Sequence, residues 1–279
     1  MQTERYRYRN MPIPGGGYVT GFAFHPKAEG VFYLRTDIGG TYRFDPGKKR
    51  WCSLIDHVTM EDVSETFPAA IALDERHPEK LYIACGMYAE EHGRFAVSKD
   101  YGENFDYYEM PMHVHGNMNG KGTGYRLIAD QKCENILWFA SQDSGLWKSC
   151  DGGSVIGGKV VRYPVSDDGR IGQGEDITPP PADSFPNGEN VGEAGDRDEA
   201  GNRPDAAGRA GSEFLEYGFA GIDASKSVPG LVVVSTISKG DGDCIYRSMD
   251  YGRTWKCILC DLEIGTMSFR MDETGRFQI

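Results

Sequence analysis

The sequence has 279 residues, of which 39% are apolar, and a formal net charge of −12 from 30 Lys and Arg against 42 Asp and Glu. This length is enough for one large domain with its own core. The acidic excess argues against a nucleic-acid partner or an anionic membrane surface, because both need clustered Lys and Arg. No apolar run approaches the roughly 20 residues of a membrane-spanning helix.

Four segments share one pattern, in which an alternating apolar strand, a polar turn and a second apolar strand follow one another. They begin at Gly21, Ala70, Arg126 and Ala220. Two more strand-like runs follow each pair, which gives a four-stranded meander of about 50 residues, the size of a propeller blade. Residues 264–279 resemble the opening of a further unit. Together with 37 glycines, the pattern predicts an all-β fold, a β-propeller of about four antiparallel blades plus the start of a fifth.

A second repeat, Ser-x-Asp-x-Gly-x-Thr/Asn-aromatic, occurs at 98–105 and 248–255, and a degraded copy begins at Ser149. This pattern is an Asp-box, or BNR repeat, which is a hairpin turn between the third and fourth strands of a blade. Its Asp caps N–H groups of the turn and its Gly takes a positive φ. We therefore interpret Asp100 and Asp250 as structural rather than catalytic.

The interval between the third and fourth repeats is long because residues 166–213 carry almost no β-branched or aromatic side chains. This stretch holds 12 Asp and Glu against 4 Arg, so it supplies −8 of the net charge. Such a composition buries too little apolar surface to offset the entropy of ordering, which predicts a disordered insertion. An ordered acidic lid over the site is the alternative. The predicted domains are then 1–165 with blades 1 to 3, the insertion, and 214–279 with blade 4 and the start of blade 5.

Three segments stand out beyond the repeats. Residues 19–46 contain RTDIGGTYR at 35–43, residues 116–127 read GNMNGKGTGYRL, and residues 144–153 read SGLWKSCDGG. In this order they resemble glycoside hydrolase family 74, the xyloglucanases and related endo-β-1,4-glucanases. The resemblance covers nearly all of the chain outside the acidic insertion. Tyr125 departs from it, because the family usually has an acidic residue at this position.

The resemblance implies two seven-bladed propellers that face each other across a cleft for a β-glucan chain, and hydrolysis that inverts the anomeric centre. An inverting enzyme needs two carboxyl groups about 6.5–9.5 Å apart. The family's general base matches Asp37, and its general acid lies in the second propeller, beyond the end of this sequence. We therefore expect the N-terminal part of an enzyme that acts on xyloglucan or a related β-1,4-glucan, with a second propeller domain as its partner. No signal segment is visible, which indicates a cytoplasmic protein on the sequence as given, whereas relatives that degrade polymers are secreted, so the sequence leaves both localisations open.

The residues around Asp37 are compatible with a general base. Asp37 follows an apolar strand and precedes Gly39 and Gly40, so its carboxylate should emerge where the backbone turns. Arg35 and Arg43 can keep that carboxylate ionised at the working pH. The alternative is that Asp37 only caps the glycine turn.

Five further residues are candidates for substrate binding. Tyr42 and Tyr88 each follow a glycine-containing turn and can offer flat surfaces to sugar rings. In the glycine-rich segment, Gly116, Gly120, Gly122 and Gly124 can let the backbone approach a sugar closely, or equally a neighbouring blade. Asn117, Gly120 and Gly122 are the substrate-binding candidates of this segment.

No cofactor or metal site is expected. Cys257 and Cys260 form a Cys-x-x-Cys pair without the second pair that zinc requires. His113 and His115 alternate before the glycine-rich segment without a carboxylate cluster, so we interpret them as loop surface. Seven scattered cysteines fit a reduced protein better than a disulfide framework.

A glycoside hydrolase, or the N-terminal portion of one, is the leading hypothesis. The alternative is a non-catalytic propeller that binds glycans or proteins, which the missing general acid and Tyr125 favour. Sialidases also contain Asp-boxes, but neither their arginine triad nor their Tyr/Glu nucleophile pair can be assembled from this sequence.

Overall fold

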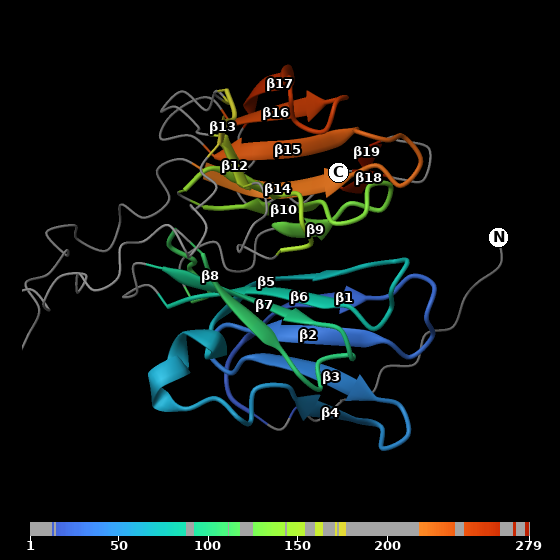
Figure 1. The fold of residues 1–279 in the computed structure, drawn as a ribbon, viewed down its shortest axis with the longest axis vertical. Coiled ribbons are helices and arrows are strands. Elements are labelled where there is room, and N and C mark those ends of the chain that lie inside the picture. The colour runs from blue at the N-terminus through green and yellow to red at the C-terminus, as the bar shows by residue number, and fades with distance from the viewer. Residues whose placement is uncertain are drawn as a thin grey trace, which may run out of the picture.

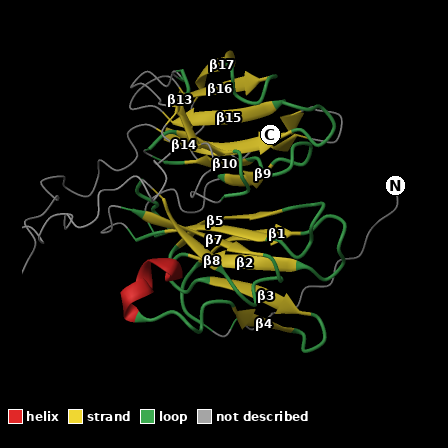
Figure 2. Cartoon of the chain, viewed as in Figure 1, coloured by secondary structure: helices red, strands yellow, loops and turns green. Residues whose placement is uncertain are grey.

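A computed structural model places the strands of the chain in five antiparallel sheets within the residues that it describes (Figures 1 and 2). Three sheets have four strands in meander order, one has five strands and one has two. The described residues are 13, 15–87, 92–110, 112–117, 125–142, 144–153, 160–163, 171, 173–176, 218–237, 243–262, 270–271 and 277–278.

The first two sheets form blades 1 and 2. Blade 1 contains β1 (Val19–Phe24), β2 (Phe32–Thr36), β3 (Thr41–Asp45) and β4 (Arg50–Ser53). Blade 2 contains β5 (Pro68–Leu73), β6 (Leu81–Cys85), β7 (Gly93–Ser98) and β8 (Asp106–Met110). A 3₁₀ helix, η1 (Met60–Thr66), connects the two blades.

The remaining sheets continue the same order. Blade 3 contains β9 (Leu127–Ala129), β10 (Leu137–Ala140), β11 (Leu146–Ser149), β12 (Val160–Tyr163) and β13 (Glu175–Asp176). Blade 4 contains β14 (Gly218–Ala224), β15 (Val232–Ile237), β16 (Asp243–Ser248) and β17 (Lys256–Leu262), and the last sheet pairs β18 (Arg270–Met271) with β19 (Phe277–Gln278). The predicted all-β class, with four-stranded antiparallel blades and the start of a fifth, is confirmed.

The acidic range 166–213 lies outside the described residues except for residue 171 and residues 173–176. There Glu175 pairs with Arg162 of β12, so the two-residue strand β13 extends blade 3 into this range. The domain limits drawn from the sequence, and the disorder of the insertion, stay predictions.

Neighbouring blades pack through shared apolar clusters, because alternate side chains of each strand point to opposite faces of its sheet. Tyr33 of β2 and Leu81 of β6 are fully buried in the cluster between blades 1 and 2. Phe95 belongs to the cluster between blades 2 and 3. Trp138 of β10 and Val234 of β15 are fully buried between blades 3 and 4. The blades therefore form one continuous stack, which fixes the loops at their ends.

The Asp-box turns have the predicted geometry. Ser98 Oγ donates to Asp100 Oδ1 at 2.8 Å, and the N–H of Gly102 donates to Ser98 Oγ at 2.8 Å. The copy at 248–255 repeats both contacts at the same distances. The glycine has a positive φ, as predicted, and so does the residue before it, Tyr101, at 63°. These aspartates are bound within their own turns, which agrees with a structural role.

Candidate functional site

Asp37 lies directly after β2, where this strand turns into β3. The N–H of Tyr18 donates to Asp37 Oδ1 at 2.7 Å, and the N–H of Asp37 donates to Tyr18 O at 3.0 Å. Asp37 is 8% exposed. The N–H of Gly39 donates to Thr36 Oγ1 at 2.8 Å. Thr36 therefore caps the glycine turn, while the segment that leads into β1 holds the Asp37 carboxylate.

Two arginines flank Asp37 in sequence, and each reaches blade 2. Arg35 is buried and donates to Pro68 O at 3.4 Å, and burial lowers the pKa of its guanidinium to about 10. Arg43 donates to Tyr101 O at 2.9 Å, in the Asp-box of blade 2. Through these contacts both side chains join blade 1 to blade 2.

Main-chain hydrogen bonds connect the turn after β2 with the start of the glycine-rich segment. The N–H of Gly40 donates to Thr66 O at 2.9 Å, at the end of η1. The next residue, Phe67, accepts the N–H of Gly86 at 3.0 Å, and Gly86 O accepts the N–H of Gly116 at 3.0 Å. We call these five residues the loop relay. It brings two segments of the predicted site to the same end of the blades.

Gly116 is needed in the loop relay because of close packing. A Cβ atom at this position would lie 2.0 Å from Phe67 O. Of the two readings of the glycines, close approach to a neighbouring blade is the one that Gly116 shows.

The other predicted substrate-binding residues differ in how exposed they are. Tyr42 is 3% exposed and lies in the apolar core of blade 1, where burial raises the pKa of its phenol. Stacking on a sugar needs an exposed ring, and the Tyr42 ring is buried because β3 turns this side chain toward the core. Asn117 is half-buried directly after the loop relay. Tyr88, Gly120 and Gly122 lie outside the described residues.

Tyr18 is a residue that sequence reasoning missed. Its side chain is 68% exposed, although its main chain holds Asp37 through two hydrogen bonds. Ile38, which follows Asp37, is 47% exposed. The available signal was the run of glycines at 15–17, which precedes an aromatic residue. An exposed aromatic ring attached to the segment that binds Asp37 is the kind of surface a pyranose can stack on.

A second buried carboxyl group lies in η1. Burial raises the pKa of Glu65, and a hydrogen bond from Tyr107 and the charge of Arg94 offset this only in part. Arg94 lies 3.3 Å from Glu65 Oε1 and 3.1 Å from Asp62 Oδ1. His57 Nε2 is 3.1 Å from the Tyr107 hydroxyl. This network anchors η1 to blade 2, directly beside the loop relay.

Within the described residues, no group of three or more His, Cys, Asp and Glu side chains could hold a metal ion. In the same part of the chain, no helix has the length and apolar character to cross a membrane.

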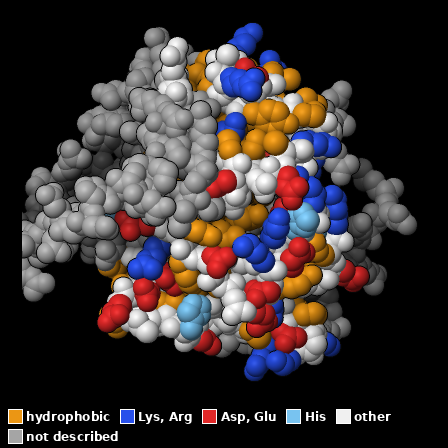
Figure 3. Space-filling view, viewed as in Figure 1, with side chains coloured by type: hydrophobic (Ala, Val, Ile, Leu, Met, Phe, Trp, Pro, Cys, Tyr) orange, Lys and Arg blue, Asp and Glu red, His pale blue; other side chains and the backbone are white. Residues whose placement is uncertain are grey.

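His113 and His115 stack with their ring centroids 5.6 Å apart, and His115 is buried rather than on the surface. Cys257 is disulfide-bonded, whereas five cysteines of the described part of the chain are free: Cys52, Cys85, Cys133, Cys150 and Cys244. On the face seen in Figure 3, acidic and basic side chains are interspersed.

Solved structures share the fold of this chain. It matches a family 74 glycoside hydrolase of Niastella koreensis with a TM-score of 0.52 and 21% identity, over 93% of this chain and 39% of that one. It matches an ancestral family 74 enzyme with a TM-score of 0.53 and 14% identity, over 92% of this chain and 28% of that one. At these identities the likeness concerns the fold alone, and it agrees with stacked propeller blades.

Curated relatives are xyloglucanases. The chain is 30% identical over 265 residues to a xyloglucanase of Paenibacillus sp., which covers 92% of this chain and 22% of the relative. It is 37% identical over 148 residues to an oligoxyloglucan-reducing end-specific xyloglucanase of Emericella nidulans, covering 53% of this chain and 18% of the relative. The chain belongs to glycoside hydrolase family 74. A third member, a xyloglucanase of Acetivibrio thermocellus, is 30% identical over 91% of this chain and 27% of its own length. This chain thus spans 18% to 27% of the length of these relatives, and no protein-family model matches it.

Proposed function

We propose that this chain is part of a glycoside hydrolase that cleaves xyloglucan or a related β-1,4-glucan by inversion, with Asp37 as the general base. The observation that carries the proposal is the placement of Asp37. The family motif at 35–43 forms the turn after β2, and Asp37 Oδ1 accepts the N–H of Tyr18 at 2.7 Å. This bond orients the carboxylate. The names of the relatives support the substrate class.

In the proposed reaction, Asp37 takes a proton from a water molecule while the water oxygen attacks the anomeric carbon. The bond between that carbon and the glycosidic oxygen breaks, and a carboxylic acid gives its proton to the leaving oxygen. Asp37 supplies the first of these steps. We assign the second to a carboxyl group of a further propeller, about 6.5–9.5 Å from Asp37 across the cleft.

Tyr18 is the proposed sugar platform in place of Tyr42. Its exposed ring belongs to the residue whose main chain binds Asp37, so a pyranose stacked on it would lie beside the carboxylate. Tyr18→Ala should raise KM for xyloglucan oligosaccharides more than it lowers kcat, because stacking is present in both the ground state and the transition state.

The test compares Asp37→Asn with Asp45→Asn, a matched control. Asn at position 37 keeps an oxygen that can accept the Tyr18 N–H but cannot take a proton. Asp45 lies in the same blade at an exposed turn, where it accepts the N–H of Lys48 at 2.9 Å. Release of reducing ends from xyloglucan is measured for this chain and for a version extended by its downstream sequence, if one exists.

The extended protein should release reducing ends, and Asp37→Asn should reduce the rate by a factor of about 10² to 10⁴ while Asp45→Asn does not. Unchanged hydrolysis by Asp37→Asn would show that the base is a different residue. Hydrolysis by the present chain alone would place the general acid within these blades and overturn that part of the proposal.

A non-catalytic glycan-binding propeller is the second candidate. Two observations favour it: Asp37 is only 8% exposed, and Tyr125 occupies a position that is usually acidic in the family. Binding of a xyloglucan oligosaccharide by the extended protein without any product would support this candidate.

A further inference from the structure

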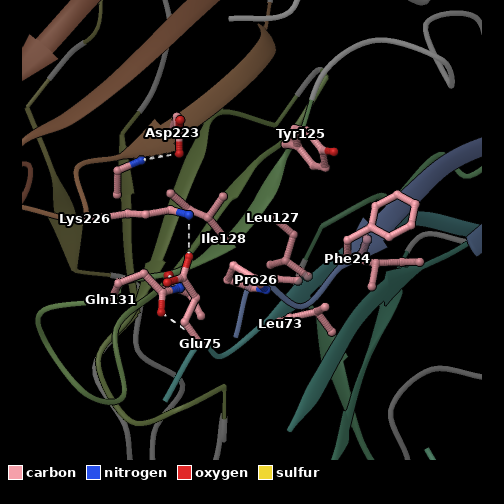
Figure 4. Close-up of a pocket in the computed structure, with 15 residues that line it drawn as sticks. Phe24, Pro26, Leu73, Glu75, Tyr125, Leu127, Ile128, Gln131, Asp223 and Lys226 are labelled. Atoms are coloured by element: carbon pink, nitrogen blue, oxygen red, sulfur yellow. Dashed lines mark hydrogen bonds and ion pairs between the residues drawn. The ribbon is translucent and has the colours of Figure 1, made fainter. Parts of the chain in front are cut away.

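The inner strands of the four blades surround a cavity of about 400 Å³, which we call the axial cavity (Figure 4). β1, β5, β9 and β14 each form one edge of their sheet, and each contributes residues to the wall. An edge strand leaves main-chain N–H and C=O groups unpaired within its own sheet. Some of these groups bind the neighbouring blade, since the N–H of Ile222 in β14 donates to Tyr125 O at 2.9 Å. The wall therefore consists of main chain as well as side chains.

One side of the axial cavity is aromatic and open. Phe24 is 63% exposed and Tyr125 is 39% exposed, so the cavity meets solvent beside these two rings. The Tyr125 hydroxyl donates to Phe22 O at 3.4 Å, which ties the loop before β9 to β1. Leu73 and Leu127 continue the wall as an apolar surface (Figure 4).

The opposite end is polar, and there three blades converge on Glu75 of blade 2. Lys226 of blade 4 lies 2.6 Å from the Glu75 carboxylate, and Lys27 of blade 1 lies 3.6 Å from it. Gln131 of blade 3 accepts the N–H of Glu75 at 3.0 Å. Asp223 also lines the cavity. Among the side chains that line the cavity, Lys226 is paired with Glu75, and Asp223 is the second carboxylate, while Lys27 reaches Glu75 from outside the lining. The one ammonium group of the lining is thus already engaged, which disfavours an anion and favours a neutral ligand.

We propose that the axial cavity binds a neutral mono- or disaccharide, at a site separate from Asp37. A pyranose has an apolar C–H face that can stack on Phe24 or Tyr125. Its hydroxyl groups both donate and accept, which suits the carboxylate, ammonium and amide groups at the polar end. Asp37 does not line this cavity, so the site and the proposed catalytic centre are distinct.

The size of the cavity supports this ligand class. Small-molecule sites span about 300–1,000 Å³, and the axial cavity is near the lower limit, which suits one or two sugar rings. A peptide that added a strand to one of the open edges would need about 17–20 Å for a strand of usual length. A space of about 400 Å³ that is open on one side favours the sugar over such a peptide.

Cellobiose is the probe for the test. The chain is titrated and followed by two-dimensional amide NMR, and the expected result is saturable shifts at residues 127–129 and 223–226 with a dissociation constant in the millimolar range. Tyr125→Ala should weaken binding by about tenfold through loss of stacking, whereas Tyr125→Phe keeps a ring and should bind within about threefold of the parent. Phe24→Ala provides the same test with the more exposed ring.

Two controls make the outcome decisive. Tyr18→Ala alters the proposed sugar platform beside Asp37, so it reports any cellobiose bound there, and it should leave the shifts at residues 127–129 and 223–226 unchanged. If Tyr18→Ala abolishes binding and Tyr125→Ala does not, cellobiose binds beside Asp37, and this proposal fails while the proposed hydrolase stands. The proposal also fails if no saturable shift occurs up to about 50 mM cellobiose, or if glycerol at the same concentration reproduces the shifts.

Discussion

Replacing Gly116 by Ala should destabilise the protein strongly, although this residue lies in a loop. The new Cβ would lie 2.0 Å from Phe67 O, so the backbone of one of the two blades has to move by about 1 Å to restore contact distances. Relief of such overpacking costs about 1–3 kcal/mol. The movement also breaks the hydrogen bonds from Gly116 to Gly86 and from Gly86 to Phe67, at about 1 kcal/mol each. The expected loss of unfolding free energy is therefore about 3–5 kcal/mol.

Thermal and urea unfolding, followed by tryptophan fluorescence, measure this loss against Gly16→Ala. A Cβ at Gly16 meets no atom within 4 Å, so this control should change stability by less than about 0.5 kcal/mol. For Gly116→Ala the melting temperature should fall by roughly 2–4 °C for each kcal/mol. Equal melting temperatures for the two variants would refute the close approach of the two blades. If the two variants melted at the same temperature but Gly116→Ala lost glycan binding, the glycine would be needed for the ligand and not for packing.

Three further results follow from burial and titration. Burial raises the pKa of Glu65, so the native state binds this proton more tightly than the unfolded chain does. The free energy of unfolding should therefore fall as pH rises from about 4.5 through the raised native pKa. Glu65→Gln should remove that fall, as measured by urea midpoints from pH 4 to 8. Hydrogen bonds from Asn104 lower the pKa of Asp100, so its contribution is present above about pH 4 and is lost as pH falls through the native pKa. Asp100→Ala should therefore cost about 1 kcal/mol at pH 7 and less near pH 2, and an equal loss at both would contradict the assignment. Burial also raises the pKa of the Cys85 thiol far above its ordinary value, whereas Cys150 is exposed, so iodoacetamide should label Cys150 first in a mass-spectrometric time course, and early labelling of Cys85 would disprove its burial.

The blades could be predicted from the sequence because each is built from local signals. The Asp-box at 98–105 specifies its own turn, since Ser98 and Asp100 bind N–H groups only a few residues away. Alternation of apolar residues then sets the strands on either side. Contacts of this range depend on the segment itself, and the order of the sheets follows from short connections.

The candidate site was less predictable because its contacts connect distant segments. η1 has no amphipathic period that marks it, and it is held by Arg94 of the next blade. Tyr42 follows a glycine turn as an exposed platform would, but strand register places its ring in the core. Lys27 and Lys226 meet at Glu75 although they lie 48 and 151 positions from it in the chain, and no pattern in the sequence marks this contact.

The loop relay has a consequence for how this surface can change over evolutionary time. Its contacts run from Gly40 through Thr66 and Gly86 to Gly116, and every one joins an amide to a carbonyl. Side-chain identity is therefore constrained only where a glycine is needed for space. Neighbours such as Tyr18 and Asn117 can be exchanged without moving the frame that carries Asp37. Ligand preference can therefore change through the side chains while main-chain hydrogen bonds keep the geometry of the site constant.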